Sequence, residues 1–253
     1  MDFTNKVVLV TGASSGIGAE IAIHFAKLSA KLALVGRNEE NLNKTASLCE
    51  KEKNIKPLTI IADISKEADI EKIIKETIDH FSALDVLINN AGISIIADIK
   101  TTTLEIFDTI MATNLRGTFY LTSLAVPHLI KSKGSIVNVS SLSSIKPYPR
   151  MLVYSMLKAA LDHFTRNIAL ELGPEGVRVN SVNPGIVITE LMTRMGLDEA
   201  MLKQITGKYI SETPLKMLAE TSDVAVQTTF LASDLAKSIT GCTHFIDGGR
   251  FLY

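Results

Sequence analysis

Short apolar runs rich in β-branched residues alternate with longer amphipathic stretches along the whole chain. The runs are KVVLVTG, KLALVGR, PLTIIAD, LDVLINN, GSIVNVSS, VRVNSVN and CTHFID. Helical patterns of ten or more residues lie between them, as in NEENLNKTASLCEKEK and KEADIEKIIKETIDHF. Strands that are apolar on both faces and separated by helices form parallel sheets covered on both sides. The alternation therefore predicts an α/β fold built on a doubly wound parallel sheet of about seven strands.

The chain is predicted to be a single domain over residues 1–253. Its length of 253 residues would allow two small domains, but no linker rich in Pro, Gly, Ser or charge interrupts it. Hydrophobic residues make up 46% of the chain. At this size, folding removes roughly three quarters of the unfolded chain's surface from water, so a large core is expected without disulfides or metals.

Charge and cysteine usage favour a small-molecule partner and a reducing compartment. The chain has 26 basic and 27 acidic residues, a formal net charge of −1, and no long basic run, which argues against binding to nucleic acid. No apolar stretch approaches the ~18 residues that cross a bilayer, and the N-terminal MDFTNKVVLV lacks a signal pattern. Cys49 and Cys242 have no paired spacing. We expect a cytoplasmic protein that does not enter the membrane.

A glycine-rich turn follows the first predicted strand. In TGASSGIGAEIAIHFAK, Gly12, Gly16 and Gly18 open a helical pattern. Glycines allow a backbone to turn tightly and to approach a pyrophosphate at a helix N-terminus, where free N–H groups favour anions. A glycine cluster alone is weak evidence, but its place between a strand and a helix in the first βαβ unit predicts a dinucleotide site.

A phenol and an ammonium lie four residues apart in YSMLK, residues 154–158. On a helix, positions i and i+4 lie on the same face, so Tyr154 and Lys158 would point into the same space. Such a pair also arises by chance on many amphipathic helices. The pair therefore needs other motifs before it indicates catalysis.

Further motifs occur in a fixed order along the chain. The glycine turn is preceded by Thr11, NNAG occupies residues 89–92, SS closes the fifth predicted strand, NPGIVIT ends the sixth, and DGG occupies residues 247–249. Over nearly the whole chain this pattern resembles the short-chain dehydrogenase/reductase family in its single-domain subtype. The resemblance implies a Rossmann-type sheet with strand order 3-2-1-4-5-6-7 and a homo-oligomer, commonly a tetramer.

The resemblance implies four catalytic residues. Tyr154 would be the proton donor to the substrate oxygen, Ser141 would orient the substrate, and Lys158 would bond the nicotinamide ribose. Asn114, in the long helix expected after the fourth strand, would hold a water that connects Lys158 to solvent. Hydride transfer to a carbonyl leaves negative charge on oxygen, and a phenol with a pKa near ~10 is a weak acid. An adjacent ammonium favours the phenolate, which gives Lys158 a physical role.

The end of the second strand is where such folds select their cofactor. An acidic residue there would hold the adenosine ribose and repel a 2'-phosphate, but the chain has Gly36 followed by Arg37. A guanidinium suits a phosphate, so NADP(H) is predicted. Some NADP-binding relatives carry a basic residue at the position of Ser15. Because this chain has serine there, use of both NAD(H) and NADP(H) stays an open alternative.

By the same resemblance, Asp63 would bond the adenine, Asn90–Gly92 would lie along the adenosine ribose, and Thr189 would bond the carboxamide. The residues assigned to the dinucleotide are Gly12, Ser14, Ser15, Gly16, Ile17, Gly18, Arg37, Asp63, Ile64, Asn90, Ala91, Gly92, Tyr154, Lys158, Pro184, Gly185, Val187 and Thr189.

Residues 188–216 would form a lid over the substrate in this family. The segment is rich in Leu and Met, with Met192, Met195 and Met201 at roughly helical spacing. Flexible thioethers suit an adaptable apolar pocket, although simple packing of the lid on the core explains them equally well. The expected substrate is an apolar ketone or alcohol such as a steroid, an isoprenoid, a retinoid or a xenobiotic carbonyl.

Two alternative functions stay open. One is reduction of 3-oxoacyl groups on acyl carrier protein, which would need basic docking residues beside the active-site mouth. Those positions are Ser132, between two lysines, and Glu175. The other is a non-catalytic NADP sensor or scaffold, against which the presence of both Tyr154 and Lys158 argues.

Metal and hydrolase chemistry are not indicated. The histidines at 24, 80, 128, 163 and 244 have no metal-ligand spacing, so no metal site is predicted. No Gly-x-Ser-x-Gly elbow is present either.

Overall fold

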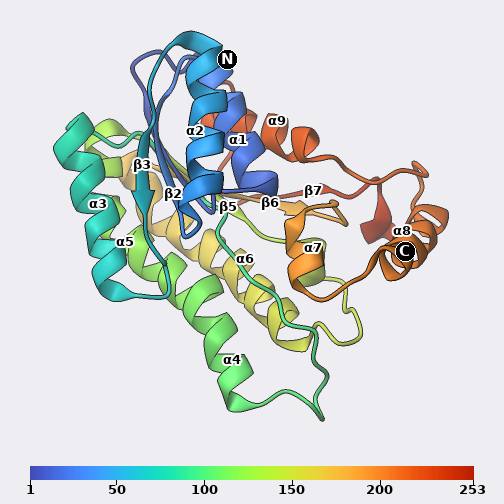
Figure 1. Ribbon diagram of the computed structural model, residues 1–253. Coiled ribbons are helices and arrows are strands. Elements are labelled where there is room, and N and C mark those ends of the chain that lie inside the picture. The colour runs from blue at the N-terminus through green and yellow to red at the C-terminus, as the bar shows by residue number, and fades with distance from the viewer.

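A computed structural model describes residues 1–253, and it contains one sheet of seven strands flanked by helices (Figure 1). The strands are β1 (Val7–Thr11), β2 (Lys31–Gly36), β3 (Leu58–Ile61), β4 (Val86–Asn89), β5 (Ser135–Val139), β6 (Arg178–Pro184) and β7 (Thr243–Ile246). The α-helices are α1 (Gly16–Lys27), α2 (Glu39–Lys53), α3 (Glu67–Phe81), α4 (Leu104–Met111), α5 (Thr118–Ser132), α6 (Leu152–Leu172), α7 (Glu190–Arg194), α8 (Glu199–Glu212) and α9 (Thr221–Ala232).

The sheet order is β3-β2-β1-β4-β5-β6-β7, and every neighbouring pair is parallel. This confirms the predicted Rossmann-type, doubly wound fold and its strand order. Val10 of β1 pairs with Leu34 of β2 on one side and with Ile88 of β4 on the other. The order reverses between β1 and β4, and ligands of such sheets bind in the crevice outside the carboxyl ends of the strands at this point.

Two hydrophobic cores lie on opposite faces of the sheet because successive side chains of a strand point to opposite sides. In β1, Val8 and Val10 join the core under α1, α2 and α9, whereas Val7 and Leu9 join the core under α3, α5 and α6. All four side chains are buried. The strands are therefore apolar on both faces, as their sequence pattern predicts.

The long helix expected after β4 is interrupted. A π-helical turn, Ala112–Gly117, joins α4 to α5. A Cβ on Gly117 would lie 2.0 Å from the Ile64 carbonyl oxygen, so only glycine permits this close approach. Such turns shift the helical register locally. Here the turn contains Asn114, whose side chain is buried.

Residues 188–216, the segment predicted as a lid, contain α7 and α8 and connect β6 to α9 (Figure 1). In Figure 1 they extend from the side of the sheet where β6 and β7 lie. None of the helices in this fold combines the length and the apolarity that a membrane crossing requires.

Candidate active site

A cavity of about 830 Å³ lies at the carboxyl ends of the strands. This volume is within the range of about 300–1,000 Å³ that is usual for small-molecule and cofactor sites. Every residue that the sequence assigned to the dinucleotide lines the cavity, and so do Ser141, Tyr154 and Lys158. Of the four residues predicted to be catalytic, only Asn114 is absent from its wall. The fold therefore brings residues from the ends of six strands, β1 to β6, and from α7 to one space.

The glycine turn between β1 and α1 has no room for side chains. Gly12 has φ +66°, in the left-handed region, and a Cβ there would lie 2.8 Å from Asn90 Nδ2. A Cβ on Gly18 would lie 2.3 Å from the Gly12 carbonyl oxygen. Asn90 Nδ2 donates a hydrogen bond to Thr11 O at 2.9 Å, which fixes the turn to the end of β4.

This turn fits the pyrophosphate of a dinucleotide. Ser15 is the N-cap of α1, but its side chain does not bond the helix N-terminus, and the first turn of α1 contains no acidic residue. The first N–H groups of a helix have no intrahelical partner, and together with the helix dipole they favour an anion. The structure of the turn is therefore that of an anion-binding cradle.

Arg37, at the end of β2, lies beside Asp63 at the end of β3. Arg37 Nη1 is 3.5 Å from Asp63 Oδ2, and the Arg37 side chain is largely exposed. Burial alone would raise the pKa of Asp63, but hydrogen bonds from Ser65 and the charge of Arg37 hold that pKa below its usual value. Asp63 therefore stays ionised, and it forms an ion pair with a largely exposed guanidinium.

Lys158 contacts the Tyr154 ring from one turn further along α6. Lys158 Nζ is 5.5 Å from the ring centre and donates a hydrogen bond to the backbone carbonyl of Val139 at 2.7 Å. Only 5% of Lys158 is exposed. The predicted i, i+4 juxtaposition is present, and the end of β5 anchors the ammonium.

The two side chains have strongly shifted pKa values. Burial lowers the pKa of Lys158 to about 8, and the charge of Asp162 opposes that fall. Burial raises the pKa of Tyr154 to about 12, and the Ser141 hydroxyl opposes that rise. Lys158 was expected to lower the pKa of Tyr154, and this effect stays a prediction, because burial of the phenol is the main cause of the rise in that pKa.

Asn114 lies behind the cavity wall. Its Oδ1 accepts a hydrogen bond from Ile93 N at 2.8 Å, and its Nδ2 donates one to Ile93 O at 2.8 Å. Both ends of the amide therefore bond the backbone just after NNAG. The side chain fixes that loop, and the role of this residue in holding a water stays a prediction.

Two buried residues that the sequence analysis missed support Ser141. Asn183 Nδ2 lies 3.0 Å from Ser141 O, 2.9 Å from Ser144 Oγ and 2.8 Å from Asp162 Oδ2, and these three acceptors share its two N–H groups. Asp162 and Asn183 are both buried. The sequence pattern that could have identified Asp162 is its position one helical turn after Lys158, on the helix face that carries Tyr154 and Lys158.

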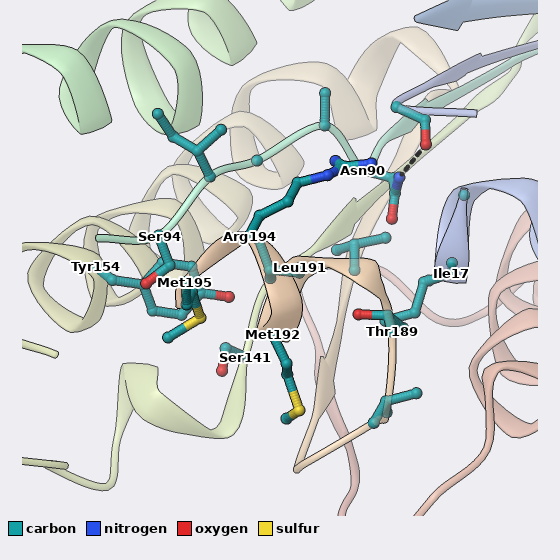
Figure 2. Close-up of a pocket in the computed structure, with 18 of the residues that line it drawn as sticks. Ile17, Asn90, Ser94, Ser141, Tyr154, Thr189, Leu191, Met192, Arg194 and Met195 are labelled. Atoms are coloured by element: carbon teal, nitrogen blue, oxygen red, sulfur yellow. Dashed lines mark hydrogen bonds between the residues drawn. The ribbon is translucent and has the colours of Figure 1, made fainter. Parts of the chain in front are cut away.

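The outer part of the cavity is walled by α7 and by polar loop residues. Met192 and Met195 line it, whereas Met201 does not and is 49% exposed. Two of the three methionines therefore belong to the cavity. Figure 2 shows Ser94, Tyr154 and Met195 grouped in one part of the close-up, with Ser141 close by.

Ser143 and Tyr148 also line the cavity, and their hydroxyls are buried without a hydrogen-bond partner. No sequence pattern indicated Ser94 or Tyr148 as residues of the site.

The positions predicted to dock a carrier protein are on the wrong edge of the sheet for this cavity. Ser132 ends α5 just before β5, and Glu175 lies just before β6. Both are therefore at the amino ends of the strands, whereas the cavity is at the carboxyl ends. The expectation that they flank the active-site mouth of their own chain is wrong. Elsewhere, no three His, Cys, Asp or Glu side chains gather as metal ligands would.

The fold and the position of the cavity define the class of Rossmann-type proteins that bind a ligand at the topological switch point. A family model described as enoyl-(acyl carrier protein) reductase matches residues 12–250. An uncharacterized oxidoreductase of Thermotoga maritima is 41% identical over 98% of each chain. L-xylulose reductase of Caenorhabditis elegans is 39% identical over 98% of this chain and 96% of its own length.

A crystal structure of 3-ketoacyl-(acyl-carrier-protein) reductase from Brucella melitensis, complexed with NADH, superposes with a TM-score of 0.90. It is 32% identical and covers 98% of this chain and 99% of its own. The chain belongs to the short-chain dehydrogenase/reductase family, and it is an oxidoreductase of that family.

Proposed function

We propose that this oxidoreductase transfers a hydride between NADP(H) and the carbonyl or secondary alcohol group of a mainly apolar small molecule. One observation carries the proposal: Tyr154, Ser141 and Lys158 share a single cavity with the glycine cradle between β1 and α1. When bound, the nicotinamide supplies or accepts the hydride. The residues of the chain then have to orient the substrate oxygen and move its proton.

Each of these side chains has a distinct role. In the reductive direction the Tyr154 hydroxyl donates its proton to the substrate oxygen, while the Ser141 hydroxyl holds that oxygen in place. With a pKa of about 8, Lys158 is mostly protonated at neutral pH. Its charge, 5.5 Å from the ring centre, stabilises the negative charge that forms on Tyr154. The Asn183 contact to Ser141 O keeps the serine backbone in place.

NADP(H) is proposed because of the charge at the end of β2. Gly36 provides no carboxylate to repel a 2'-phosphate, and Arg37 provides a guanidinium that can bind one. The Brucella reductase was crystallised with NADH, so NADH is tested beside NADPH. Competition from Asp63, 3.5 Å from Arg37 Nη1, reduces the gain from the 2'-phosphate.

An apolar substrate is proposed because of α7. Leu191 and Met192 of this helix and Met195 directly after it line the cavity. Ile205 of α8 lines it as well. We propose that residues 188–216 act as a lid that covers the substrate. The Caenorhabditis relative is named for a sugar, so polar substrates belong among the compounds tested.

Reduction of 3-oxoacyl groups on acyl carrier protein is the second candidate. The likeness to the Brucella reductase over nearly the whole chain favours it. Ser132 and Glu175 do not bear on this candidate, because both lie at the amino ends of the strands, away from the cavity. A preference for a 3-oxoacyl carrier protein over the matching short thioester would establish this alternative.

The test is the rate of nicotinamide absorbance change with steroid ketones, isoprenoid aldehydes, diketones, sugars and acyl thioesters, each with NADPH and with NADH. We expect turnover of an apolar class with NADPH, and at least tenfold lower kcat/KM with NADPH in Arg37→Gln. Faster turnover with NADH would refute the role of Arg37. Tight NADPH binding without turnover of any compound would favour a non-catalytic NADP sensor over an enzyme.

We further propose that the chain forms a homo-oligomer, a tetramer by family likeness, through α5 and α6. Phe119 on α5 is 55% exposed and Leu170 on α6 is 80% exposed, although both are apolar. Light scattering after size-exclusion chromatography should give a mass above that of one chain. Phe119→Glu should lower that mass.

A further inference from the structure

Arg194, the last residue of α7, reaches the cofactor turn from a distant part of the sequence. Its Nη2 donates a hydrogen bond to Ser15 Oγ at 3.2 Å, across 179 residues of sequence. The same nitrogen lies 2.5 Å from Glu190 Oε2 on α7. In Figure 2 the Arg194 side chain extends away from Met195 and toward Asn90.

This position puts a positive charge where the backbone is already positive. Ser15 is the N-cap of α1, so the guanidinium lies beside unpaired N–H groups and the positive end of the helix dipole. Glu190 is the only ion-pair partner of Arg194, and both side chains are about half exposed. Exposed i, i+4 pairs are weak, so Glu190 compensates this charge poorly. A phosphate between Arg194 and the α1 N-terminus would satisfy both.

The start of α7 is also attached to the cofactor turn. Thr189 is the N-cap of α7, and it packs so closely on Gly16 that a Cβ on this glycine would lie 3.1 Å from the threonine side chain. Leu191 and Met192 of the same helix, and Met195 directly after it, line the cavity. The short helix therefore contacts the cofactor turn at both ends and presents apolar side chains to the substrate space.

We infer that Arg194 binds the pyrophosphate of the dinucleotide and thereby fixes α7, so that cofactor binding completes the apolar wall of the substrate cavity. The inference rests on the proposed function only in that a dinucleotide occupies the cradle. The pyrophosphate is preferred over the 2'-phosphate because Ser15 is at the N-terminus of α1, whereas Arg37 is at the end of β2. A guanidinium can bond two phosphate oxygens at once, which holds a helix more firmly than a point charge would.

The test compares Arg194→Gln with two controls. Lys203→Gln, on exposed α8, removes the same charge from the same segment without touching the cofactor turn. Glu190→Gln removes the ion pair but keeps the guanidinium. Dissociation constants for NADPH and NADH are measured by fluorescence titration of each variant. We expect Arg194→Gln to weaken both dinucleotides by a similar factor of about 10–100. Both controls should stay within about threefold of the unsubstituted chain.

A second readout follows α7 and α8 directly. A glutamate-specific protease should cut at exposed Glu199, and the fragments are identified by mass. At saturating NADPH the cut should slow at least fivefold in the unsubstituted chain and in Lys203→Gln. In Arg194→Gln at its own saturating NADPH concentration, protection should be lost. This readout does not depend on any substrate being known.

Each other outcome has a clear reading. If Arg194→Gln weakened the binding of NADPH but not that of NADH, Arg194 would bind the 2'-phosphate, and the inference would be wrong. If Arg194→Gln changed neither dinucleotide binding nor protection from the protease, the contact to Ser15 would only pack α7, and the inference would be wrong as well. If the unsubstituted chain bound neither dinucleotide, the proposed function would fall together with the inference. Binding by the unsubstituted chain with no effect of Arg194→Gln would leave the proposed function intact.

Discussion

The ammonium nitrogen of Lys158 lies over the face of the Tyr154 ring, 5.5 Å from its centre, and its hydrogen bond goes to the Val139 carbonyl. The charge therefore acts on the phenol through space and through the π-face rather than through a bond to the hydroxyl. Because Val139 ends β5, directly before the serines at 140 and 141, the same contact ties the lysine to the strand that carries Ser141. The positions of Tyr154, Lys158 and Ser141 therefore depend on one another.

Replacing Tyr154 by Phe removes the proton donor and little else, because the ring still packs against Lys158. We expect kcat to fall by about 10²–10⁴-fold, the usual contribution of a positioned acid or base. The dissociation constant for NADPH should stay within about threefold. Steady-state kinetics and fluorescence titration measure the two quantities. Turnover within tenfold of the unsubstituted enzyme would exclude Tyr154 as the acid.

The charge on Lys158 should control the pH dependence of reduction. With a pKa lowered to about 8 by burial, the ammonium loses its proton as the pH rises through about 8. We expect kcat for reduction to be highest below this pH and to fall above it. Asp162→Asn removes the anion that raises this pKa, so the falling limb should move to lower pH. The asparagine can still accept the bond from Asn183 Nδ2.

The comparison of pH–rate profiles for the two proteins checks this. If the high-pH limb of the pH–rate profile stayed in place in Asp162→Asn, or moved to higher pH, Asp162 would not raise the pKa of Lys158. Asp198→Asn, on the exposed N-terminus of α8, is a matched control that should leave the limb unchanged.

Cofactor preference should be reversible at the end of β2. Gly36→Asp with Arg37→Gln adds a carboxylate for the ribose hydroxyls and removes the phosphate partner. A Cβ at position 36 would lie 1.9 Å from Ser14 Oγ, so Ser14→Ala is included, and Ser14→Ala alone is the control. We expect the ratio of kcat/KM for NADPH to that for NADH to fall by about 100-fold or more. An unchanged ratio would place the discrimination elsewhere.

A buried amide network should contribute measurably to stability. Asn138 Oδ1 accepts from Asn89 Nδ2 at 2.9 Å, and its Nδ2 donates to Thr165 Oγ1 at 2.8 Å. Asn138→Ala leaves buried polar groups unpaired and opens a cavity, which should lower the free energy of unfolding by about 2–4 kcal/mol. In a double-mutant cycle with Thr165→Val the losses should not add. Urea denaturation measures them, and strict additivity would contradict a shared network.

The parts of this fold that sequence reasoning predicted are those set by local periodicity and by backbone sterics. The β-branched runs gave all seven strands, and the crowding around Gly12 and Gly18 explains why the turn before α1 could be recognised. The spacing of Tyr154 and Lys158 was enough to place them together because helical geometry is regular.

The parts that it missed depend on contacts between distant segments. The bond of Arg194 to Ser15 spans 179 residues, and that of Asn183 to Asp162 joins β6 to α6. No periodic pattern specifies such a pair, because each needs the whole sheet to bring its partners together. The shift in the pKa of Tyr154 was also missed, because desolvation depends on the assembled cavity. The π-helical turn at Asn114 was missed as well, and it contains Gly117, which packs against the Ile64 carbonyl.

The cavity has walls of two different origins. The glycine cradle and Ser141 lie at strand ends and Lys158 lies on α6, all within the folded core. Four apolar residues belong instead to one segment between β6 and α9: Leu191, Met192, Met195 and Ile205. Under the proposed function, the reacting groups and much of the apolar substrate wall are therefore encoded in separate stretches of the gene. Randomising only those four codons would search a broad range of substrates while every mutant inherits the same intact reaction centre.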